Sequence, residues 1–582
     1  MKAARTIILL SLLLFTNIVF SQTVSQTLKG MVFDSEIKTP LTGATVVVLG
    51  TNPLLGTTTD LDGNYKISHV PIGRYNIHIS YIGYEPAIVS EILVTSGKEA
   101  VINAGLKQSV TQMKEVTVKA NSQKDKPINT MASISARSFT VEETRRYAGG
   151  IDDPARLVSS FAGVTVGNLQ DNAIIIRGNS PKGVSWRLEG VEIPNPNHFA
   201  GGNVVGGGFV TIFSSQLLSN SDFFTGAFPA EYGNALAGVF DMKFRNGNNE
   251  KRESTVQVGM LGIDVSSEGP FKKGKNASYL FNYRYSTLGL IADLGLLPTQ
   301  QVPRYQDLSF KLNFPTQKAG VFSFWGIGAI DNNKEHDELD FTKWETDWDR
   351  VQYDWNLNTG VLGLTHKMII GSRSYINTTL AASGIQNKMD ATRLDSSLIR
   401  RPNWHIVDKS GKITLSSFIN HKFSTRHIVK TGINYHTLFY NLDMNSTINN
   451  IPETFQNIVK ANGYSSFSEF YIQSKYDITE NFVINAGINA NYFALNNDFS
   501  IDPRFSIKWE FYPKNFLSFG YGKHSQLEEL KIYLINKNVN GNVEYPNKNL
   551  ELSHAQHFVL GYDWLINNST FASSISPLAV GF

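Results

Sequence analysis

The sequence predicts a mainly β protein that ends in an antiparallel transmembrane β-barrel. Three observations support this class. After about Lys251, long runs alternate between apolar and polar residues; before it, Asp171 to Gly247 holds short β-type runs between Gly, Asn and Pro turns; and the chain opens with a charged and then apolar segment. Alternation at period two puts the apolar side chains on one face of a strand, which is typical of a lipid-facing barrel wall.

Composition excludes several classes of function. The chain has 582 residues, a net charge of +3 and no Cys. The near-neutral charge argues against a nucleic-acid partner, and the absence of Cys excludes disulfides, thiolate chemistry and Cys-based metal sites. The sequence also lacks His-x-x-Glu and His-Glu-x-x-His zinc patterns. It shows no motif for a catalytic nucleophile and no pair of acidic residues placed for acid–base catalysis. We therefore assign no catalytic residue, metal or cofactor and do not expect an enzyme.

Residues 1–21 have the pattern of a secretory signal peptide. Lys2 and Arg5 supply positive charge, and Ile7 to Phe15 is an apolar core too short to span a bilayer. Small residues suited to cleavage precede the end of the segment. We expect the rest of the chain to leave the cytoplasm.

Residues 22–107 predict a small all-β domain. Short strands such as LKGMVFD, ATVVVLG and NYKISHV alternate with turns, among them Asp62-Gly63. The elements LKGMVFD, PLTGATVVVLG, GTTTDLDGNYKI and ISYIGY resemble the carboxypeptidase-regulatory-like domain, a transthyretin-like β-sandwich. That resemblance implies no catalysis.

Residues 108–137 are polar and predict a linker. One extended, β-branched piece, Met113 to Val118, interrupts it. It is either the last strand of the preceding domain or an isolated strand whose free backbone groups can add to the edge of a partner's sheet.

Residues 138–247 predict an α+β domain. Thr140 to Glu143 is a capping-box pattern, and Asp153-Pro154 is an N-cap followed by Pro at the first helical position. The elements IRGN, WRLEGVEIPNPNHF and GAFPAEYGNALAGVFDMKFRNG then follow in order. They resemble the plug domain of TonB-dependent outer-membrane receptors. Such a plug should be polar and Gly-rich, and held in the barrel by many modest contacts without a greasy interface.

The resemblance implies roles for individual residues. It makes Glu115, Val116, Thr117 and Val118 the TonB box. It makes Arg177, Glu231 and Arg245 contacts between plug and barrel, with Arg177 pairing with barrel acids. It places the ligand at the PNPNHF turn, on Asn195, Asn197, His198 and Phe199.

Residues 248–582 predict the barrel. Tyr279, Phe281, Tyr283 and Tyr285 alternate with polar residues, as do Phe505, Ile507, Trp509 and Phe511. The acidic stretch Asp331 to Asp354, with Trp344, Trp348 and Tyr353, is expected to be an external loop. Its aromatic residues could stack on a ligand, although a solvated loop is the simpler interpretation. A large soluble β-sandwich is the alternative to the membrane barrel.

The strand count predicts an incomplete barrel. Plugged outer-membrane transporters use about 22 strands. The residues after the plug would give only about 13 to 15 strands of about ten residues with their loops. The last segment, STFASSISPLAVGF, loses the alternating pattern. We therefore expect the chain to be a truncated or frame-shifted form of a longer receptor. The alternative is a shorter natural barrel, which the terminal Phe582 suggests.

Together these features predict a TonB-dependent receptor for active uptake of an external ligand such as a siderophore, peptide or glycan. The expected partners are TonB, outer-membrane lipid, the barrel-assembly machinery and that ligand. The expected place is the outer membrane of a Gram-negative bacterium, with the N-terminal domain in the periplasm. The alternatives are a barrel-anchored surface adhesion or structural protein and a non-functional truncated receptor.

Overall fold

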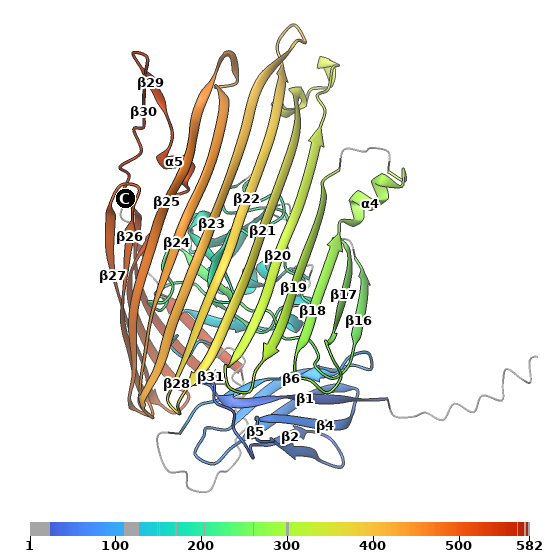
Figure 1. Cartoon of the computed structure of the whole chain (residues 1–582), viewed down its shortest axis with the longest axis vertical. Coiled ribbons are helices and arrows are strands. Elements are labelled where there is room, and N and C mark those ends of the chain that lie inside the picture. Colours follow the sequence, from blue (N-terminus) through green and yellow to red (C-terminus); the bar gives the residue numbers. More distant parts are fainter. Residues whose placement is uncertain are drawn as a thin grey trace, which may run out of the picture. The chain divides into compact units, whose positions relative to one another are not determined.

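The structure is a computed structural model of the whole chain (Figure 1). It describes residues 24–109, 127–147, 149–150, 152–168, 171–202, 204–259, 261–297, 302–566, 569–575 and 578–579. The chain divides into two compact units, residues 1–122 and residues 123–582. The expected signal peptide (1–21) and the expected TonB box, Glu115 to Val118, lie outside the described residues. None of the described helices is long and apolar enough to cross a membrane.

The N-terminal unit is a sandwich of two small sheets. Its strands are β1 (Ser25–Asp34), β2 (Thr45–Leu49), β3 (Leu55–Thr58), β4 (Asn64–Pro71), β5 (Gly73–Ser80), β6 (Ala87–Val94), β7 (Ala100–Val101) and β8 (Ala104–Leu106). One sheet has the order β4-β1-β7, with β8 also on β1, and the other has the order β3-β2-β5-β6. Alternate residues such as Val46, Val48, Ile77 and Ile79 are buried between them.

The second unit begins with an α+β domain, here called the plug (residues 127–247). Its elements are β9 (Ala136–Phe139), α2 (Val141–Arg146), α3 (Pro154–Leu157), η1 (Val158–Ser160), β10 (Val164–Asn168), β11 (Asp171–Ile176), η2 (Pro181–Gly183), β12 (Val184–Leu188), β13 (Val191–Ile193), β14 (Ser221–Phe224) and β15 (Gly238–Met242). The central sheet has the order β13-β12-β15-β14-β9, and β10 pairs with β11. The predicted capping box at Thr140 and the predicted N-cap at Asp153 are both present.

The plug begins earlier than its motifs indicate. The backbone N–H groups of Ile128 and Asn129 donate to the carboxylate of Asp222 at 2.9 and 2.8 Å. Residues 127–137, which the sequence analysis places in the linker, are thus tied to the plug sheet. Polar backbone contacts of this kind leave no hydrophobic pattern in the sequence.

The plug core is aromatic. The Trp186 ring stacks on Phe240 with centroids 4.3 Å apart, and Phe223 lies 4.4 Å from Phe240. These residues face each other because β12 and β15 run parallel with Trp186 opposite Phe240. Inward-facing barrel residues join the same cluster, namely Leu280, Trp325, Ile327, Ala329, Val361 and Ala381. The expectation of an interface without apolar contacts is therefore wrong on this side of the plug.

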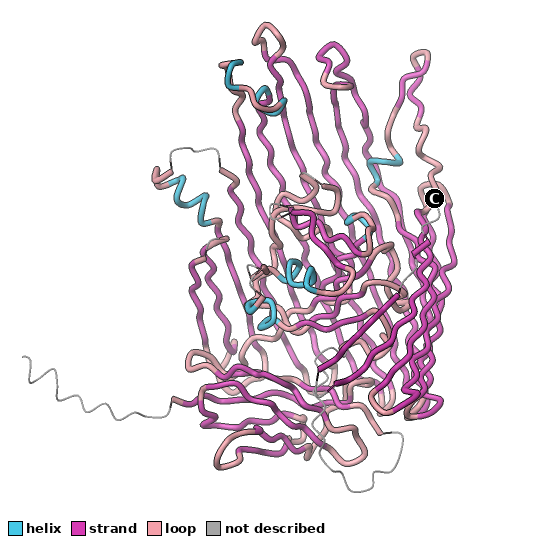
Figure 2. Tube along the Cα trace, turned by 180° about the vertical axis from the view of Figure 1, so that it is seen from behind, coloured by secondary structure: helices cyan, strands magenta, loops and turns pink. Residues whose placement is uncertain are grey.

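The barrel is a 16-stranded antiparallel sheet that curves around the plug (Figure 2). Its strands are β16 (Glu253–Val258), β17 (Ile263–Pro270), β18 (Ser278–Tyr285), β19 (Arg304–Pro315), β20 (Val321–Glu335), β21 (Val351–Ile370), β22 (Ser374–Leu394), β23 (Arg400–Ser424), β24 (His427–Ile448), β25 (Ile451–Thr479), β26 (Phe482–Phe493), β27 (Asp498–Tyr512), β28 (Asn515–Gln526), β31 (Ser553–Ile566), β32 (Ser569–Ile575) and β33 (Leu578–Ala579). The order runs from β16 to β28, then β31 and β32, with β33 also on β31. Residues 569–575 and 578–579, expected to lose the strand pattern, form β32 and β33.

Strand alternation separates a lipid-facing surface from a polar lumen, as predicted. In β27, Phe499, Ile501 and Phe505 are exposed on the outside, whereas Asp502 and Arg504 are buried toward the plug. The same pattern holds in β18, where Asn282 and Arg284 face inward. Apolar residues can face hydrocarbon without cost, while the inward polar groups need partners in the plug.

Strands β21 to β25 are 20 to 29 residues long, about twice what a tilted crossing needs. They therefore extend beyond the membrane. The acidic stretch expected as one loop is mostly ordered: β20 continues to Glu335, β21 starts at Val351, and η3 (Phe341–Lys343) and η4 (Asp347–Arg350) lie between them. Its Asp337 is bound by Arg400 through two contacts of 2.8 and 2.9 Å.

The remaining elements lie in connections between strands. They are α4 (Thr287–Asp293), α5 (Leu530–Tyr533), β29 (Lys537–Val539) and β30 (Asn542–Glu544). The connection with α5 packs on the barrel wall, where Tyr533 is buried with Phe467 and Phe493. The backbone N–H of Leu527 donates to Asn234 Oδ1 of the plug at 2.8 Å, so this connection also touches the plug.

The aromatic plug core yields a stability prediction. Replacing Phe240 by Ala should lower the free energy of unfolding by about 3–5 kcal/mol, because a fully buried ring leaves a cavity. Replacing Phe271, which is 47% exposed, should cost less than about 1 kcal/mol. Urea unfolding of the purified protein, followed by near-UV circular dichroism, measures both. Equal losses would show that the stacked ring does not hold the plug together.

Candidate functional site: the interface between plug and barrel

The segment Glu231-Tyr232-Gly233-Asn234 supplies the plug side of a buried polar network. It lies between β14 and β15, and all four residues contact charged or polar neighbours. Gly233 is required there, because a Cβ on it would lie 2.2 Å from Glu469 Oε2 of the barrel. Asn234 adopts a φ of 51°, a conformation that Asn tolerates better than most residues.

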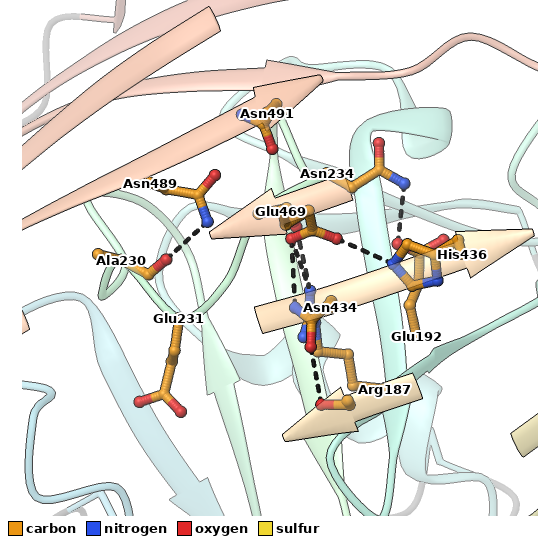
Figure 3. Close-up of polar contacts among 12 residues, drawn as sticks. Arg187, Glu192, Ala230, Glu231, Asn234, Asn434, His436, Glu469, Asn489 and Asn491 are labelled. Atoms are coloured by element: carbon orange, nitrogen blue, oxygen red, sulfur yellow. Dashed lines mark hydrogen bonds and ion pairs between the residues drawn. The ribbon is translucent and has the colours of Figure 1, made fainter. Parts of the chain in front are cut away.

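Glu469, on β25, is the acidic centre of the network (Figure 3). It is buried, and Arg187 Nη2 of the plug lies 3.9 Å from its Oε2. His436 Nε2, on β24, lies 3.2 Å from its Oε1, and Asn434 Nδ2 donates to Oε2 at 3.5 Å. Arg187 is also buried and donates to the carbonyl of Gly233 at 3.3 Å. A plug cation is thus held against a barrel anion away from water.

A second pair lies beside it. Lys412 Nζ of β23 is 2.9 Å from Glu192 Oε1 of the plug, and Asn234 Nδ2 donates to Glu192 Oε2 at 2.8 Å. Burial opposes ionisation of Glu192, but the charges of Lys412, His436 and Arg187 outweigh it and lower its pKa to about 2. Glu192 is therefore a carboxylate at neutral pH.

Glu231 joins the plug to β24 and β25. Its carboxylate pairs with Lys430 Nζ and accepts from Gln473 Nε2 at 3.0 Å. Asn129, at the start of the plug, donates to the same carboxylate at 2.8 Å. Burial raises the pKa of Glu231, but Lys430 and the hydrogen bonds lower it below its usual value overall.

Two further ion pairs cross the interface at other strands. Arg245 grips Glu268 of β17 through both terminal nitrogens at 2.6 and 2.7 Å. Lys311 of β19 lies 2.8 Å from Glu189. Of the three residues expected to link plug and barrel, the structure thus places Glu231 and Arg245 on oppositely charged barrel residues.

Arg177 is placed differently from the expectation. Among the described residues it has no ion pair, and its buried Nη1 has no hydrogen-bond partner. Its backbone is in the left-handed region (φ 51°), and its side chain passes over Gly163 toward Gly226. The plug arginines that do meet barrel acids are Arg187 and Arg245. Arg177 and Arg187 both lie in strand-like runs, so their sequence context does not distinguish them.

His198 is buried and clamped by two barrel acids. Its Nδ1 lies 2.5 Å from Asp331 Oδ1 of β20, and its Nε2 lies 3.0 Å from Asp307 Oδ2 of β19. Ionised carboxylates only accept hydrogen bonds, so both ring nitrogens must donate, which requires the imidazolium form. Burial lowers the pKa of His198, but Asp331 and Asp307 outweigh it and raise it above 6.5.

The other expected ligand positions are also turned inward. Asn197 is buried and accepts from Asn172 at 3.0 Å, and Asn195 donates to the carbonyl of Gly207 at 2.8 Å. Phe199 donates its backbone N–H to Asp331 and packs on Trp355 at 5.5 Å. The following turn holds the exposed residues Val204 and Val205. The PNPNHF turn therefore anchors the plug in this state, and its glycine-rich continuation faces the solvent.

Several residues of the network were missed by the sequence analysis, chiefly Arg187, Glu469 and His436. The signal for Arg187 was a charge inside a strand-like run. Glu469 and His436 sit at inward positions of alternating strands, a placement they share with many solvated residues. Within the described ranges, no three His, Asp or Glu side chains gather as a metal site.

The chain resembles known proteins in its N-terminal region, in part of its sequence and in its fold. Residues 28–118 match the family described as CarboxypepD_reg-like domain. The match includes Glu115 to Val118, in line with the alternative that this piece is the last strand of the β-domain. TonB-dependent transporter Oar of Myxococcus xanthus is 25% identical over 276 residues, which cover 45% of this chain and 25% of that protein. The matched region thus spans about a quarter of that relative's length.

Solved structures share the fold. The siderophore receptor PirA from Pseudomonas aeruginosa has a TM-score of 0.54 at 12% identity, covering 76% of this chain and 74% of that one. PirA from Acinetobacter baumannii has a TM-score of 0.55 at 13% identity, covering 76% and 70%. The outer membrane transporter YddB from Escherichia coli has a TM-score of 0.52 at 13% identity, covering 74% and 67%. These matches confirm the resemblance to TonB-dependent receptors at the level of the fold.

The ion pair of Glu231 can be tested by removing its cation. Lys430→Met should lower the free energy of unfolding by about 3 kcal/mol, because it leaves a carboxylate without its charge partner. Lys343→Met, whose pair with Glu338 is exposed, should cost less than about 1 kcal/mol. Urea titration measures both. The double variant Lys430→Met/Glu231→Gln should recover part of the loss; no recovery would mean that Lys430 acts through packing alone.

The clamp on His198 predicts a pH dependence. Because its pKa is raised in the folded state, the clamp should stabilise the plug fully below about pH 6.5 and weaken as pH rises through the higher folded-state value. His198→Gln should remove this component. Unfolding midpoints between pH 5.5 and 8.5 give the comparison. Parallel curves for the two proteins would contradict an imidazolium at this position.

Proposed function

We propose that this chain acts as a TonB-dependent outer-membrane transporter, with its N-terminal β-domain in the periplasm. The sequence relationship to a TonB-dependent transporter and the shared fold support the proposal. The plug lies inside the barrel and carries its own aromatic core, so it can shift against the wall without losing its fold. The buried charge pairs give it a defined resting position.

The observation that carries the proposal is a chain of contacts from the linker to the barrel wall. Asn129 lies just after the linker and donates to Glu231 Oε1 at 2.8 Å and to the Tyr232 hydroxyl at 2.9 Å. The other oxygen of Glu231 pairs with Lys430 of β24. A pull on the linker thus acts first on Asn129. Asn129 and Lys430 of the barrel bind the same carboxylate, that of Glu231.

This arrangement suits mechanical release. Tension on Asn129 draws on the Glu231 side chain, and the neighbouring pairs of Glu192 and Arg187 lie on the same side of the plug. Ion pairs can exchange one partner for water as a gap opens, whereas an apolar contact only loses area. We infer that pulling opens the contacts on β23 to β25 first, while the apolar contact around Trp325, together with the ion pairs on β17 and β19, holds the plug against those strands.

The ligand would approach from the end where the long strands project. Val204 and Val205 are exposed in the glycine-rich turn, next to Trp355 of β21. Gly202 lies against this ring, since a Cβ on it would be 2.7 Å from the indole. We propose that an external ligand of the siderophore, peptide or glycan kind first touches this turn. Its displacement would be passed to His198 through the adjoining Phe199.

The TonB contact is testable in the purified chain. Val116→Pro should weaken binding of the purified C-terminal domain of TonB at least about tenfold, since Pro removes a backbone donor needed for strand addition. Val116→Ile keeps the β-branched side chain and the donor, and should bind as the unchanged chain does. Isothermal titration calorimetry gives the affinities.

The outcomes separate the competing interpretations. Equal binding by Val116→Pro and the unchanged chain would place the TonB contact outside Glu115 to Val118 and leave that piece as the last strand of the β-domain. No binding by the unchanged chain would reject TonB-dependent transport and favour a surface adhesion or structural role.

A further inference from the structure

A group of basic side chains meets between the plug and three adjacent barrel strands. Arg177 comes from the plug, Arg504 from β27, His524 from β28 and His557 from β31. The imidazole rings of His524 and His557 have centroids 4.2 Å apart. His524 and Arg504 also lie against Phe228 of the plug, with His524 4.0 Å and the guanidinium carbon 5.1 Å from its ring centroid.

These groups hold hydrogen-bond donors without acceptors. His524 is fully buried, and neither of its ring nitrogens has a partner in the described structure. The backbone N–H of Ala227 donates to His557 Nδ1 at 3.1 Å, so the proton of the neutral ring is on Nε2, which is buried without an acceptor. Three arginine nitrogens are likewise buried without a hydrogen-bond acceptor, namely Nε and Nη2 of Arg504 and Nη1 of Arg177.

The nearby acid does not satisfy them. Among the described residues, Asp502 is the one carboxylate within ion-pair distance of this group, 3.8 Å from Arg504 Nη2. That carboxylate already accepts from Ser525 Oγ at 2.7 Å and from Asn491 Nδ2 at 3.3 Å. With both histidines neutral, two arginines face one aspartate, so the cluster keeps an excess positive charge.

Two glycines allow the chain to pass close to these nitrogens. A Cβ on Gly226 would lie 3.1 Å from Arg177 Nη1 and 3.5 Å from His557 Nδ1. A Cβ on Gly522 would lie 2.5 Å from His524 Nε2. A side chain at either position would crowd these nitrogens. Such a set of uncompensated buried donors costs free energy unless an acceptor joins it.

We propose that this cluster is a buried anion-binding site that bridges plug and barrel. The occupant is a small anion that accepts from Arg177 on the plug and from Arg504, His524 and His557 on the wall. Water fits less well, because it brings no negative charge to offset the excess positive charge of the two arginines. The anion gives Arg177 the negative partner that no described barrel residue supplies. The site does not depend on transport, so its test is independent of the proposed function.

The test uses the purified full chain in detergent at constant ionic strength. Chloride, phosphate or acetate replaces the bulky sulfonate isethionate in steps while Tm is measured. A bound anion should raise Tm saturably, by about 3 °C at high occupancy. Arg504→Met and His524→Phe, which keep side-chain size but remove donors, should abolish the rise. Arg401→Met, which breaks an exposed pair with Asp395, should retain it.

The anions distinguish the source of the negative group. A rise with chloride or phosphate supports a free inorganic ion, and a rise with acetate alone supports a carboxylate carried by a larger molecule. Broadening of the ³⁵Cl NMR line by the unchanged chain, reversed by phosphate, supports the first case even if a variant fails to fold. Equal Tm values in all four salts, or an unchanged rise in Arg504→Met and His524→Phe, would overturn the proposal.

Discussion

The need to pair most of the charges that the plug buries against the barrel organises this structure. A charge removed from water costs several kcal/mol unless an opposite charge and hydrogen bonds meet it. Glu231, Glu192, Arg245 and Arg187 of the plug each meet such a partner on a different strand. Because the partners are spread over the wall, they fix how the plug is rotated and how deep it sits, which apolar packing alone would define less sharply.

The same constraint explains local features of the chain. Gly233 has no side chain because Glu469 occupies that space, and His198 is held as an imidazolium because two aspartates from neighbouring strands converge on it. On the side of Trp325 the barrel instead contributes apolar residues to the plug core. The plug thus has a polar side, on β23 to β25, held by ion pairs, and a mixed side, on β17 to β22, held by ion pairs such as Lys311–Glu189 together with apolar packing. Under the proposed function, this asymmetry gives a pulled plug a preferred direction of release.

The position of the linker fits that asymmetry. Asn129, just after the linker, bonds directly to Glu231 on the polar side. The basic cluster around His524 lies on β27, β28 and β31, away from β18 to β22 in the strand order. The charges of plug residues are therefore neutralised on some barrel strands and not on others. Acidic plug residues meet lysines on β23 and β24, whereas Arg177 faces other cations.

The sequence by itself determined the domain order, the mainly β class, the strand alternation and the capping motifs, because each follows from local spacing of residue types. It also marked Glu231 and Arg245 through the motif around EYGN. Only the tertiary structure decided which buried charges meet. Arg177 and Arg187 look alike along the chain, and the PNPNHF turn looks like an exposed loop. The partners of these residues depend on which barrel strand lies opposite them. Such contacts join residues more than 200 positions apart, as with Arg187 and Glu469, and leave no local pattern in the sequence.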